Sequence, residues 1–193
     1  MLKRSDLMDI IEYEKVRKKY RKDIILYKKN RRIKLGSNIT ITFENKKTIK
    51  FQIQEIMRAE RMVHDHQIQE ELDIYNSLLP PPNGLSATLF IEVTDESKIK
   101  KVLNQFIGLT KGNNMFFQIN GEKVFSQFEK GREEQDKISS VHYISFMFDE
   151  RMKKLFLAID RDISLSVSYN HYDFSKLITS EMHLSLADDL NIW

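Results

Sequence analysis

Three consecutive prolines, Pro80 to Pro82, impose the strongest local constraint on how this chain folds. Proline fixes its own backbone torsion and lacks an amide hydrogen, so three in a row favour an extended spacer. Helical spacing dominates before this spacer, and mixed strands and helices follow it. We therefore expect residues 1–80 to be a basic N-terminal helical region with a short strand and residues 83–193 to be an α+β sheet domain, packed together as one compact unit.

The N-terminal region is predicted to be mainly helical. Its first helical segment, either one long helix or two short ones, should end near Arg32. Residues 39–43, ITITF, alternate β-branched and aromatic side chains as a strand does. Residues 49–63 fit both a strand and a helix, and their length favours a helix, while residues 67–79 keep helical spacing throughout.

The C-terminal region mixes strands with helices. Asn120–Gly121 is typical of a two-residue hairpin turn, because both positions need positive φ. The predicted order, strand-helix-strand-strand-strand-helix-strand, suits an antiparallel or mixed β-sheet with helices on one face, a ferredoxin-like variant with one extra strand. Residues 174–190 should close the chain with helical turns. The predicted strands are residues 87–93, 115–119, 123–128, 139–148 and 163–169, and the predicted helices are residues 96–109 and 150–159.

Composition excludes several classes of site. The chain has no cysteine, which removes disulfides, thiolate zinc sites, iron-sulfur ligation and cysteine nucleophiles. Its six glycines cannot form a dinucleotide fingerprint or a phosphate loop, and it lacks a nucleophile elbow, a His-Glu-x-x-His pair and a calcium loop. No apolar run has the length of a signal peptide core or a membrane span, so we expect a soluble cytoplasmic protein. These patterns identify neither a reaction nor a cofactor.

The net charge of +3 conceals a strong asymmetry. Residues 1–34 carry 13 Lys and Arg against 5 Asp and Glu, whereas the remaining residues carry 18 against 23. The basic segment has three interpretations: docking on an acidic protein, nucleic-acid binding with Tyr13, Tyr20 and Tyr27 stacking on bases, or a solvated helix face whose tyrosines pack on the body. The predicted partner-binding residues are Lys18, Lys19, Arg21, Lys22, Lys28, Lys29, Arg31 and Arg32.

Two glutamates fall on the apolar sides of the predicted helices 49–63 and 67–79. Helical phase places Glu60 between Ile53 and Met57, and it places Glu71 beside Tyr75. A buried carboxylate must be paired, bind a metal or be protonated. One interpretation is a paired-carboxylate site for a metal or for acid-base chemistry, and the other is that each Glu is neutralised by a base or by backbone amides.

Histidines are the natural partners for such a site. His64 and His66 could chelate a metal, although a hydrated connection between two helices explains them better. His142 and His171 lie in or beside predicted strands, and they would converge if those strands were antiparallel neighbours. The metal candidates are therefore Glu60, Glu71, His142 and His171.

Five segments together resemble an uncharacterised bacterial family, domain of unknown function 3501, along nearly the whole chain. They are FQIQEIMRAER, EELDIYNSLLP, NGLSATLFIE, DKISSVH and SYNHY, whereas PPPNG is richer in proline than the family pattern. The genes of that family often lie near those for rubrerythrin and an iron-sulfur oxidoreductase. The resemblance thus implies an acidic redox protein as partner and a role in bacterial redox or peroxide-stress metabolism. The candidate ligand-binding residues within or beside the matching segments are Arg58, Glu60, Arg61, Glu71, Tyr75, Asn76, His142 and His171.

Three functions follow as hypotheses. The first is a noncatalytic accessory or interaction protein that docks through its basic segment. The second is a metal- or small-ligand-binding enzyme centred on the two glutamates and a histidine. The third is a nucleic-acid-binding regulator.

Overall fold

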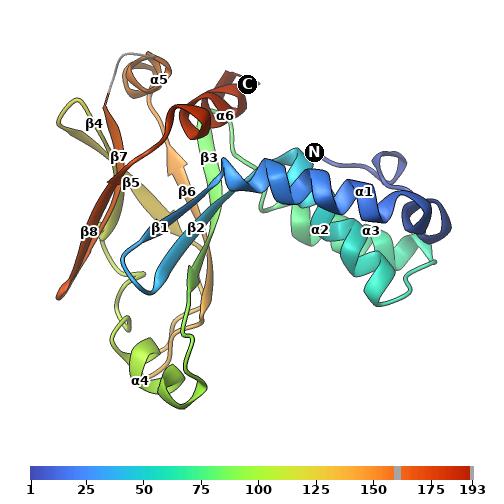
Figure 1. Cartoon of the computed structure of the whole chain (residues 1–193), viewed down its shortest axis with the longest axis horizontal. Coiled ribbons are helices and arrows are strands. Elements are labelled where there is room, and N and C mark those ends of the chain that lie inside the picture. The colour runs from blue at the N-terminus through green and yellow to red at the C-terminus, as the bar shows by residue number, and fades with distance from the viewer. Residues whose placement is uncertain (159–161, 192–193) are drawn as a thin grey trace.

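Eight strands form one antiparallel sheet that curls into a nearly closed barrel (Figure 1). The structure is a computed structural model that describes residues 1–158 and 162–191. The strand order is β1-β2-β3-β6-β5-β4-β7-β8, so strands from both ends of the chain form the two edges. The strands are β1 (Arg32–Leu35), β2 (Ile39–Glu44), β3 (Gly84–Ile91), β4 (Met115–Ile119), β5 (Glu122–Phe128), β6 (Val141–Met147), β7 (Ile163–Tyr169) and β8 (Tyr172–Leu177).

Alternation of side chains along the strands builds the barrel core. In β2 the inward residues Ile39, Ile41 and Phe43 are fully buried among the apolar side chains of the other strands. The ring of Phe117 lies at the centre, with ring centroids 5.7 Å from Phe43 and 4.7 Å from Phe146. The core therefore depends on aromatic contacts between strands that are distant in sequence.

Tyr172 joins the two edges of the sheet. Its hydroxyl donates to the carbonyl oxygen of Leu35, 2.5 Å away, and accepts from the amides of Asn38 and Ile39 at 2.9 and 3.1 Å. Gly36 makes this approach possible, because its φ is +67° and a Cβ there would lie 2.5 Å from the Tyr172 hydroxyl oxygen. One side chain thus takes the place of the strand pairing that would close the barrel.

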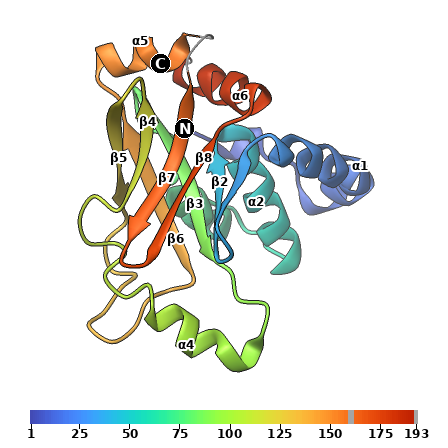
Figure 2. The same ribbon diagram turned by 60° about the vertical axis from the view of Figure 1, so that its left-hand side comes forward.

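Helices cover the sides and ends of the sheet. In both views α5 and α6 lie at one end of the barrel and α4 lies at the other (Figure 2). Helices α1, α2 and α3 form a separate layer beside the sheet, with a core of their own that includes Ile49, Ile53 and Leu72. The helices are η1 (Arg4–Asp6), α1 (Ile10–Lys29), α2 (Lys46–Ala59), α3 (Asp65–Asn76), η2 (Glu96–Lys98), α4 (Ile99–Asn104), α5 (Glu150–Leu157) and α6 (Ser180–Asn191).

The ferredoxin-like arrangement expected from the sequence is wrong, although the mixture of helices and strands is present. That fold needs helices on one face of an open sheet, whereas here the sheet curls into a nearly closed barrel. Two strands, β1 and β2, come from before the prolines, and β2 pairs with both β1 and β3 in the same sheet. The sequence patterns missed β1 and β8, and they assigned most of β8 to the closing helical turns.

Several local predictions are confirmed. The ambiguous residues 49–63 are helical up to Ala59, and the Asn120–Gly121 turn joins β4 to β5 with φ of +50° and +82°. The helix expected at residues 150–159 ends at Leu157, and residue 159 lies outside the described residues.

Candidate interaction surface on the first helix

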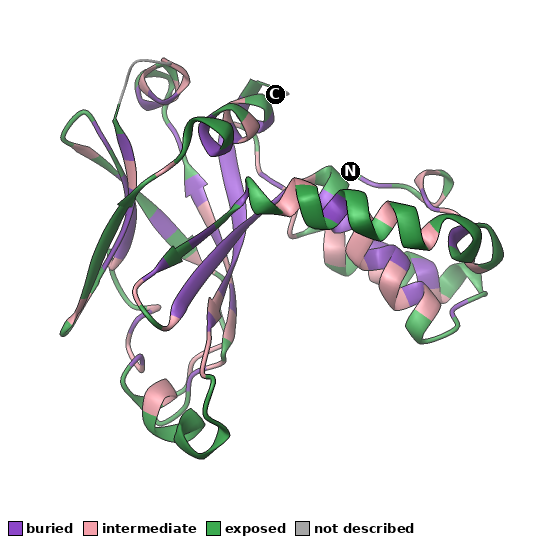
Figure 3. Ribbon diagram, in the orientation of Figure 1, coloured by how far each residue is buried: buried purple, intermediate pink, exposed green. Residues whose placement is uncertain are grey.

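Helix α1 begins at a capped position and runs for 20 residues. The Asp9 side chain accepts a hydrogen bond from the amide of Glu12 at 2.8 Å, which satisfies one of the free donors at the helix start. The helix carries eight Lys and Arg against three Asp and Glu, and only Tyr13 and Ile24 are buried. Figure 3 shows most of this helix as exposed. Packing therefore uses only one narrow side of it.

That packed side is held by Glu55 of α2. Glu55 accepts from the Tyr13 hydroxyl at 2.7 Å and from two nitrogens of Arg17 at 2.8 Å each. The bonds from Arg17 and then from Tyr13 hold the pKa of Glu55 below its usual range, against the opposing effect of burial. Burial, reinforced by Glu55, raises the pKa of Tyr13 far above its ordinary value. A two-pronged Arg–carboxylate contact fixes both distance and orientation, so it sets how α1 lies on α2.

The three tyrosines of the basic segment all face the body of the protein. Tyr20 packs edge-on against Tyr13 and Phe51, with ring centroids 5.9 Å apart in each pair. The Tyr27 hydroxyl accepts from the side-chain Nδ2 of Asn45 at 2.7 Å, and the ammonium of Lys47 lies 4.1 Å from the Tyr27 ring centre. These contacts agree with the interpretation of a solvated helix face whose tyrosines pack on the body. The tyrosines would have to leave them to stack on nucleobases.

The opposite side of α1 combines positive charge with apolar groups. Helical spacing brings Lys18, Lys22 and Lys29 onto one line, with Ile25 and Leu26 beside them. Ile25 and Leu26 are 46% and 50% exposed, so they add apolar contact area to this side of the helix. We call this surface the outer face, and it comprises Lys18, Lys19, Arg21, Lys22, Ile25, Leu26 and Lys29.

Five of the eight predicted partner-binding residues belong to the outer face. Lys18, Lys19, Arg21, Lys22 and Lys29 are exposed, and none forms an ion pair within the described part of the chain.

The other three basic residues already have partners. Lys28 lies 3.7 Å from Glu44, and Arg32 bonds to Glu92 at 2.5 Å. Arg31 is fully buried and bonds to Asp189, so it is not accessible to a partner. The sequence could not separate Arg31 from its neighbours because the partner is 158 residues away.

The predicted carboxylate pair is not buried as expected. Helix α2 ends at Ala59, so Glu60 is its exposed C-cap residue and leaves the apolar side. Glu71 is half-buried, and its pKa is raised first by burial and then by the negative charges of Glu60 and Glu70. The two acids therefore lie within electrostatic range, but the core-facing position predicted for Glu60 is wrong.

The remaining candidates on α2 and α3 mostly have structural contacts. Arg58 bonds to Glu14 of α1, and Asn76 binds the amide and carbonyl of Leu2 at 2.7 and 3.0 Å. Arg61 is exposed with a φ of +53°, and Tyr75 is half-buried. Asn76 thus fastens the N-terminal segment to α3, and Arg58 joins α2 to α1.

The two histidines predicted as metal candidates, His142 and His171, do not come together. His142 is fully buried, and its Nε2 lies 2.8 Å from the carbonyl oxygen of Ser139, whereas His171 is exposed in the turn after β7. Their strands, β6 and β7, are separated in the sheet by β5 and β4. His64 and His66 are exposed in and before the first turn of α3. Across residues 1–158 and 162–191, no three His, Asp or Glu side chains form a group that could hold a metal ion.

Sequence reasoning missed the apolar half of the outer face. The sequence patterns above did not single out Ile25 or Leu26, yet both lie with the lysines rather than with Tyr13 and Ile24. The available signal was their phase, since Ile25 follows Lys18 and Lys22 by seven and three positions on the same helical line.

Comparison with known proteins places the chain in a family. The sequence model of a family described as "Protein of unknown function (DUF3501)" matches residues 1–190. The chain belongs to this family. A crystal structure described as a novel protein of unknown function from Burkholderia pseudomallei is similar to it, with a TM-score of 0.90, 30% identity and 98% coverage of both chains. A comparison with curated proteins gave no match.

The DUF3501 match confirms the resemblance seen in the five segments. Neither matching description names an activity, a ligand or a partner. Among the helices of the described residues, none is both long enough and apolar enough to cross a membrane.

Proposed function

We propose that this protein is a noncatalytic interaction protein that docks on an acidic surface of another protein through the outer face of α1. The observation that carries this proposal is the composition of the outer face. Five exposed basic side chains, which form no ion pair with any residue that the structure describes, surround two exposed aliphatic ones. Basic groups would steer an acidic partner to this helix, and Ile25 and Leu26 would supply the apolar contact that holds it.

A protein partner fits the outer face better than a nucleic acid does. Single-stranded nucleic acids are bound by aromatic rings interleaved with positive charge, and the tyrosines of α1 are turned inward. The exposed side chains among the lysines are aliphatic, and these suit an apolar patch with an acidic rim. The redox protein that the family resemblance implies is one candidate partner of this kind.

A photo-crosslinking side chain at position 22 of the full chain tests the proposal in cells, with the same group at position 101 as control. Lys101 is also exposed and basic, but it lies on α4 at the far end of the barrel. We expect position 22 to capture one acidic protein that position 101 does not. Capture of nucleic acid or lipid alone, or equal capture at both positions, would contradict the proposal.

Reconstitution with the captured protein identifies the residues responsible. Reversing Lys18, Lys19, Arg21 and Lys22 to Glu should abolish binding, and Ile25→Ser with Leu26→Ser should weaken it without changing its salt dependence. The matched control reverses four exposed lysines elsewhere, namely Lys100, Lys101, Lys130 and Lys137. If this control lowers affinity as much as the reversal on α1 does, net charge rather than the outer face is responsible, and the proposal fails.

A further inference from the structure

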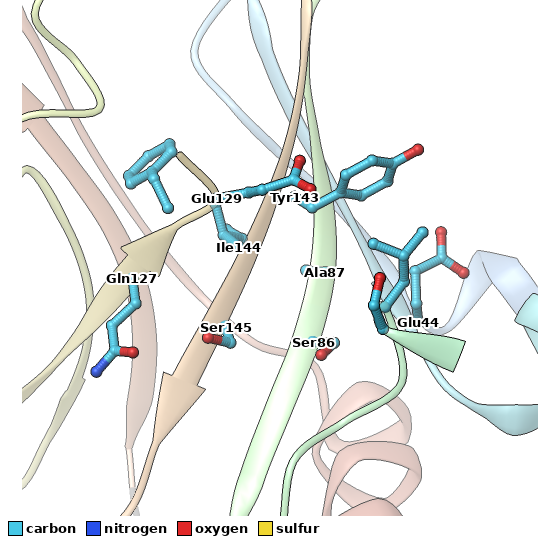
Figure 4. Close-up of a pocket in the computed structure, with 11 residues that line it drawn as sticks. Glu44, Ser86, Ala87, Gln127, Glu129, Tyr143, Ile144 and Ser145 are labelled. Carbon is cyan, nitrogen blue, oxygen red and sulfur yellow. The ribbon is translucent and has the colours of Figure 1, made fainter. Parts of the chain in front are cut away.

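A polar row crosses four neighbouring strands on the outside of the sheet. The strand register pairs Glu44 of β2 with Ser86 of β3, Ser86 with Ser145 of β6, and Ser145 with Gln127 of β5. Residues paired across antiparallel strands project from the same face, so these four side chains stand side by side. Figure 4 shows Gln127 at one end of the row and Glu44 at the other, with the two serines between them.

The row forms the floor of an open groove of about 360 Å³. Tyr143 stands above the row, and Ser77 and Leu78, which follow α3, line the groove as well. Two of the lining residues are acidic, Glu44 and Glu129, and none is Lys, Arg or His. The lining therefore offers hydrogen-bond acceptors and negative charge.

Glu44 is buried with one oxygen atom unpartnered. It is 3% exposed, and its Oε1 accepts from the hydroxyl of Thr88 at 3.2 Å and lies 3.7 Å from the ammonium of Lys28. Its Oε2 is inaccessible to solvent and has no hydrogen-bond partner among the described residues. Buried carboxylate oxygens are almost always hydrogen-bonded, so an unpartnered one is an exception that needs an explanation.

Glu44 and two further acids lie within electrostatic range of Tyr75. Burial raises the pKa of Tyr75, and the neighbouring Tyr143, Glu71, Glu60 and Glu44 raise it further. Two bases lie nearby: Lys28 contacts Glu44, while Arg132 bonds to Glu129 and stacks on Tyr143. Both are bound to the acids from outside the lining, and neither reaches the free oxygen of Glu44.

We infer that the groove binds a small organic amine, whose ammonium group pairs with the carboxylate of Glu44 in the groove wall while the serine hydroxyls and Gln127 bind the rest of the molecule. The ligand is a cation because the lining is acidic, and it is small because the groove is at the lower end of the range for ligand sites. This inference is independent of the docking proposed for α1, since the outer face shares no residue with the groove.

The test uses 1,4-diaminobutane as the probe and 1,4-butanediol as the uncharged control of the same length. In titrations followed by amide NMR of the full chain, we expect the diamine to shift the signals of Ser86, Tyr143 and Ser145 saturably. The diol should leave them in place. An absence of saturable shifts with the diamine, or equal shifts with both compounds, would overturn the inference.

Two variants locate the binding at the groove. Glu44→Gln keeps the shape and the bond with Thr88 but removes the charge, so it should weaken diamine binding by about tenfold or more. Gln127→Lys places a positive charge at the solvent-exposed end of the polar row, where the substitution should not impair folding. The added charge repels the diamine, so this variant should also weaken binding strongly. Glu122→Gln is the matched control, because Glu122 pairs with Arg151 at the surface and does not line the groove. Unchanged affinity in Gln127→Lys, or an equal loss in Glu122→Gln, would refute the site even if Glu44→Gln failed to fold.

Discussion

Arg31 and Asp189 form a buried ion pair that joins the start of β1 to the last turn of α6. Arg31 is fully buried and Asp189 is 4% exposed. The remaining donors of Arg31 are also used: its Nε binds the carbonyl oxygen of Phe43 at 3.0 Å, and its Nη1 binds that of Ser185 at 3.1 Å. Asp189 in turn accepts from the amide of Asn45 at 2.8 Å. One guanidinium therefore connects α6, β2 and the end of α1.

Removal of Arg31 should destabilise the protein severely. Arg31→Ala leaves the carboxylate of Asp189 buried without its charged partner, which should lower the free energy of unfolding by about 3–5 kcal/mol. Arg32→Ala is the control, because the ion pair of Arg32 with Glu92 is exposed and should contribute less than about 1 kcal/mol. Urea denaturation measures both values, and similar losses in the two variants would contradict the role assigned to Arg31.

The Tyr172 hydroxyl should stabilise the closed barrel. Tyr172→Phe leaves the amides of Asn38 and Ile39 and the carbonyl of Leu35 without this partner, so we expect a loss of about 1–3 kcal/mol in the free energy of unfolding. Tyr20→Phe is the matched control, since Tyr20 contacts its neighbours through its ring. Chemical denaturation of both variants tests this, and equal stability of Tyr172→Phe and wild type would show that the closure does not depend on the hydroxyl.

His142 should make the protein less stable in mildly acidic solution. Burial lowers the pKa of His142 below its ordinary value of 6.5, so the unfolded chain binds this proton more tightly than the folded protein. The free energy of unfolding should be unaffected by this group above pH 6.5 and should fall as the pH drops through the folded-state pKa. His142→Gln should remove this decline in thermal unfolding followed by circular dichroism. A variant that retains the same decline would assign it to another group.

Glu55 should govern a second, more acidic transition. The bonds from Arg17 and Tyr13 hold the pKa of Glu55 below its ordinary 4.5. Its contribution to stability is therefore fully present above pH 4.5 and is lost as the pH falls through the lowered pKa. Glu55→Gln should reduce stability at neutral pH and flatten the acidic limb of the pH profile. The surface variant Glu122→Gln should leave that limb unchanged, and the two experiments together separate Glu55 from general acid unfolding.

Local patterns predicted much of the secondary structure because its causes lie within a few residues. The hairpin at Asn120 depends on two positions that accept positive φ, and the helical layer depends on apolar side chains spaced by three and four. The family resemblance rested on whole segments and was confirmed along nearly the whole chain.

Predictions from the sequence were wrong where a residue's position depends on a contact with a residue distant in the sequence. Curling of the sheet brings Tyr172 to Leu35, a contact that no local pattern encodes. The position of Glu60 depended on where α2 ends, and helix ends are set by capping geometry that periodicity does not reveal. The unpartnered oxygen of Glu44 can be recognised only when the strand register and the burial of Glu44 are both known. The preceding ITITF segment indicates a strand and nothing more.

The position of Tyr172 late in the sequence also affects how the chain folds during its synthesis. The ribosome synthesises β1, β2 and β3 first, but β8, whose Tyr172 binds the chain at the end of β1, is the last of the eight strands to emerge. Until then the nascent sheet presents unpaired backbone groups, which are templates for association with other chains. A polypeptide released before Tyr172 should therefore aggregate rather than persist as a smaller folded form.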